Sequence, residues 1–118
     1  MIKKLSDFED DKGIEIAARI LEIIVVILQD DRNEEMKGEE NIIKMVSTFM
    51  KNSPAEMRQI FAILSEQDPE TYHCNGAEAM TNMLILINDP VVVSLFISPS
   101  QMGDAKSSGS PSENTEEN

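Results

Sequence analysis

The chain has 118 residues, of which 41% are hydrophobic and 4% are aromatic, and its formal net charge is −12. This length is sufficient for one domain with one core. The negative charge repels phosphate groups and so argues against binding to nucleic acid or to an anionic membrane. A single cysteine, Cys74, leaves no partner for an internal disulfide, which is consistent with a reducing cytoplasm.

The first helix is expected from about Asp11 to Gln29. It follows a short lead, MIKKLSDFEDD, that has no sustained apolar face. Ser6 and Glu9 have the spacing of a capping box, and the acids before the helix carry negative charge to the positive end of its dipole. These features predict where the helix begins.

The centre of this helix, IEIAARILEIIVVIL at positions 14–28, is apolar except for Glu15, Arg19 and Glu22. These charges recur at spacings of four and three, which places them on one face of a helix. We expect the rest of the helix to be buried nearly all round, either by helices of the same chain or in part by another subunit. At 1.5 Å per residue the run reaches only about 22 Å, too short for a bilayer of about 30 Å.

The segment from Asp30 to Glu40, DDRNEEMKGEE, has no apolar repeat and predicts a solvated connector. A calcium loop that began at Asp30 would need an oxygen ligand, a glycine and a glutamate where Arg32, Glu35 and Asn41 stand. We therefore expect no metal site in this segment. A second helix is predicted from about Glu39 to Lys51.

Four further helix starts are marked by capping residues. Ser53, Pro54 and Glu56 predict a helix from Pro54 to about Gln67. Asp68 and Pro69 predict a short helical turn through Tyr72. The remaining two starts are a capping box of Asn75 and Glu78, which opens a helix from Gly76 to about Asn88, and the pair Asp89 and Pro90, which precedes an apolar segment from Val91 to Ile97.

From Ser98 onward the sequence is rich in Ser, Gly, Asn and Glu and has almost no apolar residues. Such a composition cannot form a core and predicts disorder. The expected organisation is a helical domain at 1–97 and a disordered acidic tail at 98–118. The predicted fold is all-α, a small bundle of four to five helices around the apolar first helix.

The sequence offers no set of residues suited to catalysis. His73 and Cys74 are its only histidine and cysteine, whereas a zinc site normally takes four ligands and a Cys/His pair needs spatial register that sequence neighbours seldom have. No glycine-rich loop fits a phosphate group, and no spacing favours a Ser/His/Asp arrangement. We expect a structural loop at His73 and Cys74, no enzyme activity, no cofactor and no metal. What remains is an all-helical interaction protein.

Several stretches together resemble a known family. They are the Lys-Leu-Ser start, the apolar first helix, the segments SEQDPETY and NDPVVVSLF, and the ending SSGSPSENTEEN. This layout resembles the tail assembly chaperones of long-tailed, siphovirus-type bacteriophages of Gram-positive bacteria. The resemblance implies a non-enzymatic helical factor in the cytoplasm of the infected host that binds the tape measure protein, keeps it soluble and recruits tail-tube protein. It also implies absence from the mature virion and, in many such phages, a longer frameshifted form.

Binding a long helical partner requires adaptable apolar grooves, and methionine side chains repack easily around varied ligands. We also expect self-association, through the first helix or the segment from Val91 to Phe96. The candidate partner-binding residues are Met45, Phe49, Met50, Met57, Phe61, Met80, Met83, Leu95 and Phe96.

A different class of function also fits the composition. The chain could be a small acidic regulator, such as an antitoxin or a nucleic-acid mimic, that masks a basic partner with the charges between Asp30 and Glu40. Salt separates the two hypotheses, because it screens exposed charge contacts and leaves apolar burial largely intact.

Overall fold

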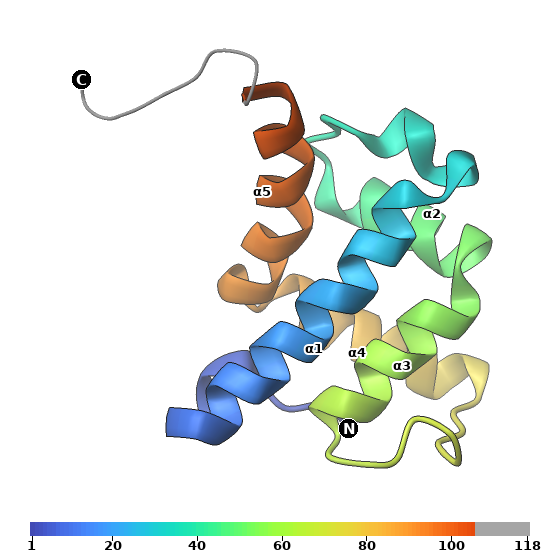
Figure 1. Cartoon of the computed structure of the whole chain (residues 1–118). Helices are drawn as coiled ribbons and strands as arrows, with labels where there is room; N and C mark the ends of the chain where they lie inside the picture. Colours follow the sequence, from blue (N-terminus) through green and yellow to red (C-terminus); the bar gives the residue numbers. More distant parts are fainter. Residues whose placement is uncertain (106–118) are drawn as a thin grey trace.

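The computed structural model describes the backbone of residues 1–105 and the side chains of residues 1–97. Within this part of the chain there are five α-helices, two short 3₁₀ helices and no strand, so the predicted all-α class is confirmed (Figure 1). In chain order the elements are η1 (Leu5–Asp7), α1 (Asp10–Gln29), η2 (Asp31–Met36), α2 (Ile42–Asn52), α3 (Pro54–Leu64), α4 (Gly76–Ile87) and α5 (Pro90–Ala105).

Helix α1 is the element against which most of the others pack. It contacts α3, α5, η1 and η2, and in Figure 1 α5 and α3 lie on its two sides. Its buried positions recur at helical spacing, so that one face carries the core side chains. These are Ile16, Ile20, Ile24, Ile27 and Leu28.

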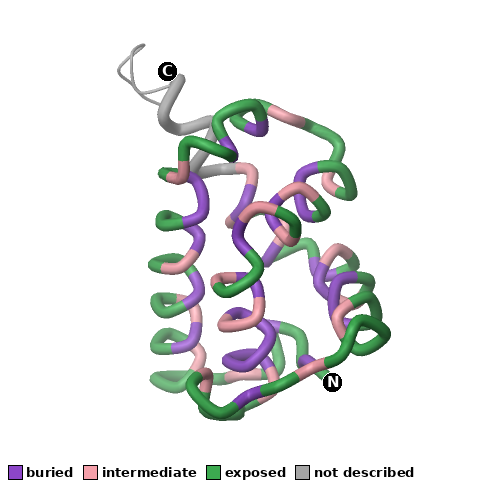
Figure 2. Tube along the Cα trace, turned by 90° about the vertical axis from the view of Figure 1, so that its right-hand side faces the viewer, coloured by how far each residue is buried: buried purple, intermediate pink, exposed green. Residues whose placement is uncertain are grey.

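The opposite face of α1 is open, and the expected burial nearly all round is not met within one chain. Ile14 is 70% exposed, Leu21 and Val25 are each 40% exposed, and Val26 is 52% exposed. Figure 2 shows the buried positions of α1 facing the other helices and the exposed positions facing outward. The reason is that α3, α5 and the two 3₁₀ helices cover only one side of α1.

The predicted capping residues lie close to the observed helix starts. Not all of them form the predicted capping hydrogen bonds. Asn75 and Glu78 form the predicted capping box, in which each side chain accepts the other's backbone N–H at 2.8 Å. Ser53 precedes α3 as predicted, but its hydroxyl accepts a hydrogen bond from Asn33 instead of capping the helix. Ser6 lies within η1, and α1 begins after Glu9 without a side-chain cap.

Helix α3 ends three residues earlier than predicted. The segment from Asp68 to Tyr72 forms a single turn, in which the N–H groups of Thr71 and Tyr72 donate to Asp68 O at 3.1 and 2.9 Å, as predicted, and it does not extend into a helix. Glu66 adopts a left-handed backbone with φ of 60°. Its N–H donates to Ile63 O, and the Gln67 N–H donates to Ala62 O at 2.9 Å. This is a Schellman motif, and it ends the helix at Leu64, before the polar residues Ser65, Glu66 and Gln67.

The predicted solvated connector contains a buried anchor. Asn33 is fully buried, and its side-chain amide donates to Ile27 O at 2.8 Å and to Ser53 Oγ at 3.0 Å. It also accepts a bond from the Asn52 amide at 3.2 Å. Because buried polar groups require partners, Asn33 holds η2 against the ends of α1 and α2.

The N-terminal lead is tied to the late part of the chain. The Ile2 N–H donates to Asn82 Oδ1 at 3.3 Å, and the Leu5 N–H donates to Asp89 Oδ2 at 2.8 Å. The Lys3 N–H donates to Leu64 O at 2.8 Å. The first residues therefore join the end of α3 to α4 and to the turn between α4 and α5.

Helix α5 continues to Ala105, past the predicted domain end at Ile97. A helix that has already formed extends by one hydrogen bond per residue and does not need an apolar face to do so. The rest of the predicted tail, 106–118, lies outside the described residues.

No single helix of the described chain is long and apolar enough to cross a membrane. Helices α4 and α5, the latter up to Ile97, reach that length and composition only as a pair, across a bend of 87°.

The division of α1 into two faces predicts losses of stability of different size for two nearby substitutions. Ile24→Asp places an unpaired carboxylate in the core and should lower the free energy of unfolding by at least about 3 kcal/mol. Val26→Asp adds the same group on the open face and should cost no more than about 1 kcal/mol. Urea unfolding followed by circular dichroism measures both, and equal costs would contradict the two-faced description.

A second prediction concerns acid stability. The Arg32 guanidinium donates to both carboxylate oxygens of Asp30, at 3.1 and 2.7 Å, and the Arg32 backbone N–H donates to Asp30 Oδ1 at 2.9 Å. The side-chain bonds first, and then the backbone bond, lower the pKa of Asp30 to about 2 from its ordinary 3.8. Because the folded pKa is the lower one, the ionised pair stabilises the fold above pH 3.8. That stabilisation is lost as the pH falls toward 2.

Asp30→Asn should therefore lower the free energy of unfolding at neutral pH. Near pH 2 the variant and the parent protein should be equally stable. Arg32→Gln removes the side-chain bonds but keeps the bond from the backbone N–H of residue 32 to Asp30 Oδ1, so it should show part of the same pH-dependent loss. Urea midpoints across this pH range measure the effect. If the urea midpoints of variant and parent differed by the same amount at every pH, the role given to the Asp30–Arg32 pair would be contradicted.

Candidate functional site

An apolar pocket of about 430 Å³ lies where the end of α2, helix α3 and the start of α4 meet. This volume falls in the range of about 300–1,000 Å³ that is typical of ligand pockets. We call it the methionine pocket. Its lining residues are Met50, Pro54, Ala55, Met57, Arg58, Phe61, Cys74 and Ala79.

The spacing of residues on α3 explains one wall of the methionine pocket. Pro54, Met57 and Phe61 are separated by three and four positions, so they follow one another along one face of the helix. Arg58 also reaches this wall, but its guanidinium donates to Pro69 O at 3.3 Å and to Tyr72 O at 3.2 Å. Arg58 therefore holds the turn that precedes Cys74.

Three of the nine predicted partner-binding residues, Met50, Met57 and Phe61, line this pocket. Met50 is half-buried, whereas Met57 and Phe61 belong to the core and are only 1% and 2% exposed. Of the others, Met80 is exposed on α4 and Leu95 is half-buried on α5. The remaining four lie in the core, where the rings of Phe49 and Phe96 stack with centroids 5.7 Å apart. These four are Met45, Phe49, Met83 and Phe96.

The sequence reasoning missed the small residues of the pocket. Ala55 and Ala79 stand beside large apolar side chains and leave the space that a larger residue would fill. Cys74 also lines the pocket and is half-buried. The sequence does place Ala55 next to Pro54, in the first turn of α3. It does not show that Met50, Cys74 and Ala79, which come from other elements, line the same pocket.

His73 and Cys74 lie on different cavities. Cys74 lines the methionine pocket, whereas His73 is exposed and lines a separate cavity of about 300 Å³ with Tyr72, Ala77 and Asn82 among its other residues. The two side chains are therefore not brought together as a catalytic pair would be. In addition, nowhere in residues 1–97 are three His, Cys, Asp or Glu side chains grouped so that they could hold a metal ion.

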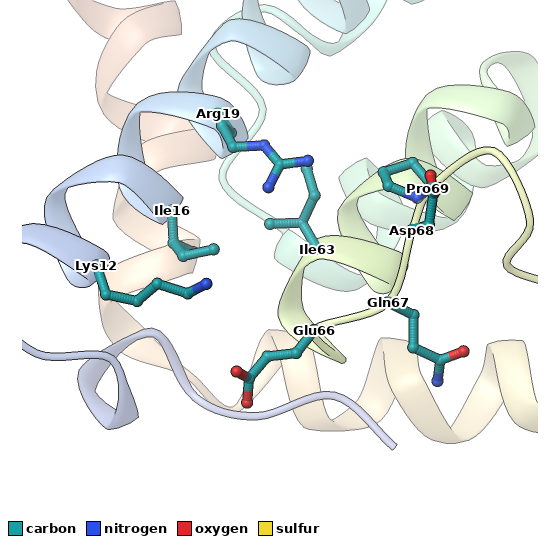
Figure 3. Close-up of a pocket in the computed structure, with 8 residues that line it drawn as sticks. All are labelled: Lys12, Ile16, Arg19, Ile63, Glu66, Gln67, Asp68 and Pro69. Atoms are coloured by element: carbon teal, nitrogen blue, oxygen red, sulfur yellow. The ribbon is translucent and has the colours of Figure 1, made fainter.

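A charged cleft of about 370 Å³ separates α1 from the segment that follows α3. Lys12 and Arg19 extend into it from α1, and Glu66 and Asp68 line the other wall (Figure 3). Glu66 also forms an ion pair with Lys3. The hydrogen bond and charge of Lys3, with a smaller effect of the charge of Lys12, lower the pKa of Glu66. The cleft thus places opposite charges on facing walls, and its lining includes no serine or cysteine.

No family model, no curated protein and no solved structure matches this chain. Among the described residues, the arrangement best suited to binding is the methionine pocket, which offers a concave apolar surface on a strongly acidic protein. It has the character of a receptor for a large apolar side chain.

The pocket can be tested through its cysteine, which is the only thiol in the sequence. Ala79→Trp should fill the space beside Cys74 and slow its reaction with a thiol reagent several-fold. Ala77→Trp changes an exposed residue of α4 that does not line the pocket and should leave the rate unchanged. Equal rates of Cys74 modification in the two variants would contradict the pocket. The rate measured in urea gives the value for the unfolded chain.

Proposed function

We propose that this protein is a tail assembly chaperone of a long-tailed bacteriophage, acting without catalysis in the cytoplasm of the infected host. In this proposal it binds the tape measure protein, keeps it soluble and helps to recruit tail-tube protein, and it does not enter the mature virion. The observation that carries the proposal is the methionine pocket, and the sequence resemblance supplies the identity of the partner.

The physical basis is the insertion of apolar side chains from a helical partner. A few anchors that fill pockets supply most of the binding energy in protein interfaces. Met50 is half-buried at this pocket, and its flexible, polarizable side chain can adapt to different anchors along a long partner, above the buried Met57. The net charge of −12 would keep the resulting complexes apart and in solution.

Many copies on one long partner would also meet one another. Helix α4 exposes Met80 at 52% and Leu84 at 51%, four positions apart on one face, and its only charged residue is Glu78. Contacts between copies through this face would bring few like charges together. We therefore assign self-association to α4 within the proposal, in place of the first helix or the segment from Val91 to Phe96, whose Val92 and Phe96 are buried in the core.

The rival, an acidic regulator, receives less support from the structure. The acids of the segment from Asp30 to Glu40 partly pair with cations of the same segment, since Arg32 pairs with Asp30 at 2.7 Å and Lys37 pairs with Glu34 at 3.2 Å. These acids are therefore partly neutralised by their own neighbours. An apolar pocket has no role in the masking of a basic partner.

The decisive experiment is co-expression of the chain, tagged at its C-terminus, with the tape measure protein encoded in the same genome. We expect the tape measure protein to become soluble and to co-purify at high salt. Ala55→Glu places a charge on the exposed rim of the pocket and should reduce recovery by about tenfold or more. Ala77→Glu is the matched control, because Ala77 is an exposed alanine outside the pocket.

Two results would contradict the proposal. One is a tape measure protein that stays insoluble and does not co-purify with the parent chain. The other is recovery of only a small basic protein that high salt releases, which would favour the acidic regulator.

A further inference from the structure

We propose that the exposed face of α1 docks an amphipathic helix whose apolar side is flanked by Lys or Arg. This surface is separate from the methionine pocket, so the inference goes beyond the proposed function and can fail independently of it. It gives a role to the apolar residues of α1 that the core does not use.

The surface is a row of four residues, Ile14, Ala18, Leu21 and Val25, which we call the α1 row. All four are exposed, and Ile14 is the most exposed at 70%. Their spacing of four, three and four keeps them on one helix face over about 16 Å. The same spacing forms the seam of paired helices, so the row has the shape of a site for another helix.

Acidic residues border the α1 row on one side. On the helix surface Glu15 lies three positions before Ala18, Glu22 lies four positions after it, and Asp11 lies three positions before Ile14. All three acids are exposed, and none of them forms an ion pair within the part of the chain that is described. The edge of the row is therefore negative and without a bound cation.

The cations of the same helix are directed elsewhere. Lys12 and Arg19 extend from α1 into the charged cleft, toward the segment after α3 (Figure 3). Lys12 acts there on Glu66, whose pKa is lowered chiefly by Lys3 and to a smaller extent by Lys12. The helix thus sorts its charges, with cations toward the cleft and acids along the row.

This separation of charges on α1 indicates which kind of partner can bind to the α1 row. In an antiparallel pair of two copies, the edge with Glu15 would face the same edge of the other copy, near its Glu22, and each chain carries a net charge of −12. An anionic membrane would be repelled for the same reason. A helix with Lys or Arg beside its apolar residues would instead pair with the acids while its apolar side covers the row.

Two model peptides test this with the full chain. Both form helices with leucines at the spacing of the α1 row, and they differ only in carrying Lys or Glu beside the leucines. In fluorescence anisotropy at low salt, the Lys peptide should bind at least about tenfold more tightly than the Glu peptide. Leu21→Gln should weaken binding of the Lys peptide about tenfold.

Ile43→Gln is the matched control for Leu21→Gln. Ile43 is 56% exposed on α2, away from the row, and its substitution should leave binding of the Lys peptide unchanged. The double variant Glu15→Lys, Glu22→Lys should transfer the preference to the Glu peptide, an effect that loss of stability alone could not produce. Circular dichroism checks that each variant retains its helix content.

Equal binding of the two peptides, or no binding of either, would overturn the proposal. A dimer of the parent chain that Leu21→Gln dissolves in sedimentation velocity would also overturn it and would assign the row to a second copy. Ala55→Glu should leave peptide binding unchanged. Recovery of the tape measure protein without binding of the Lys peptide would therefore refute this inference alone.

Discussion

The structure depends on how a single apolar helix divides its surface. The buried isoleucines of α1 each contribute about 1.5–3 kcal/mol of transfer free energy, and α3, α5 and both 3₁₀ helices pack against that face. The helix nevertheless has more apolar surface than this chain can cover. The docking of another helix that we propose would cover this surface.

Polar groups determine how the covering elements are placed. Asn33 holds η2 to the ends of α1 and α2, and Asn82 accepts the Ile2 N–H while its amide donates to the Tyr72 hydroxyl at 3.1 Å. Each of these buried side chains would be costly without its partners, so each fixes one arrangement of its neighbours. The apolar core supplies the stability, and these few bonds select the geometry. The methionine pocket lies at a joint between elements that are fixed in this way.

The sequence predicts the local features of this fold better than the long-range ones. Helical spacing and the cap of Asn75 depend on residues a few positions apart, and they locate the helices to within a few residues. The left-handed ending at Glu66 was missed because the residue that usually marks it is glycine. Which face of α1 is exposed could not be read from its residues, since isoleucine, leucine and valine occupy both faces. The pocket was only partly predicted, because Ala55, Cys74 and Ala79 meet the methionines through tertiary packing.

The anchoring of the N-terminus has a consequence for the order in which the chain acquires its structure during synthesis. The amides of Ile2 and Leu5 find their acceptors in Asn82 and Asp89, which the ribosome adds much later. Closing so long a loop is entropically costly, and contacts of this kind form late. The apolar face of α1 therefore emerges without most of the elements that will cover it. During this interval the nascent chain is most exposed to aggregation.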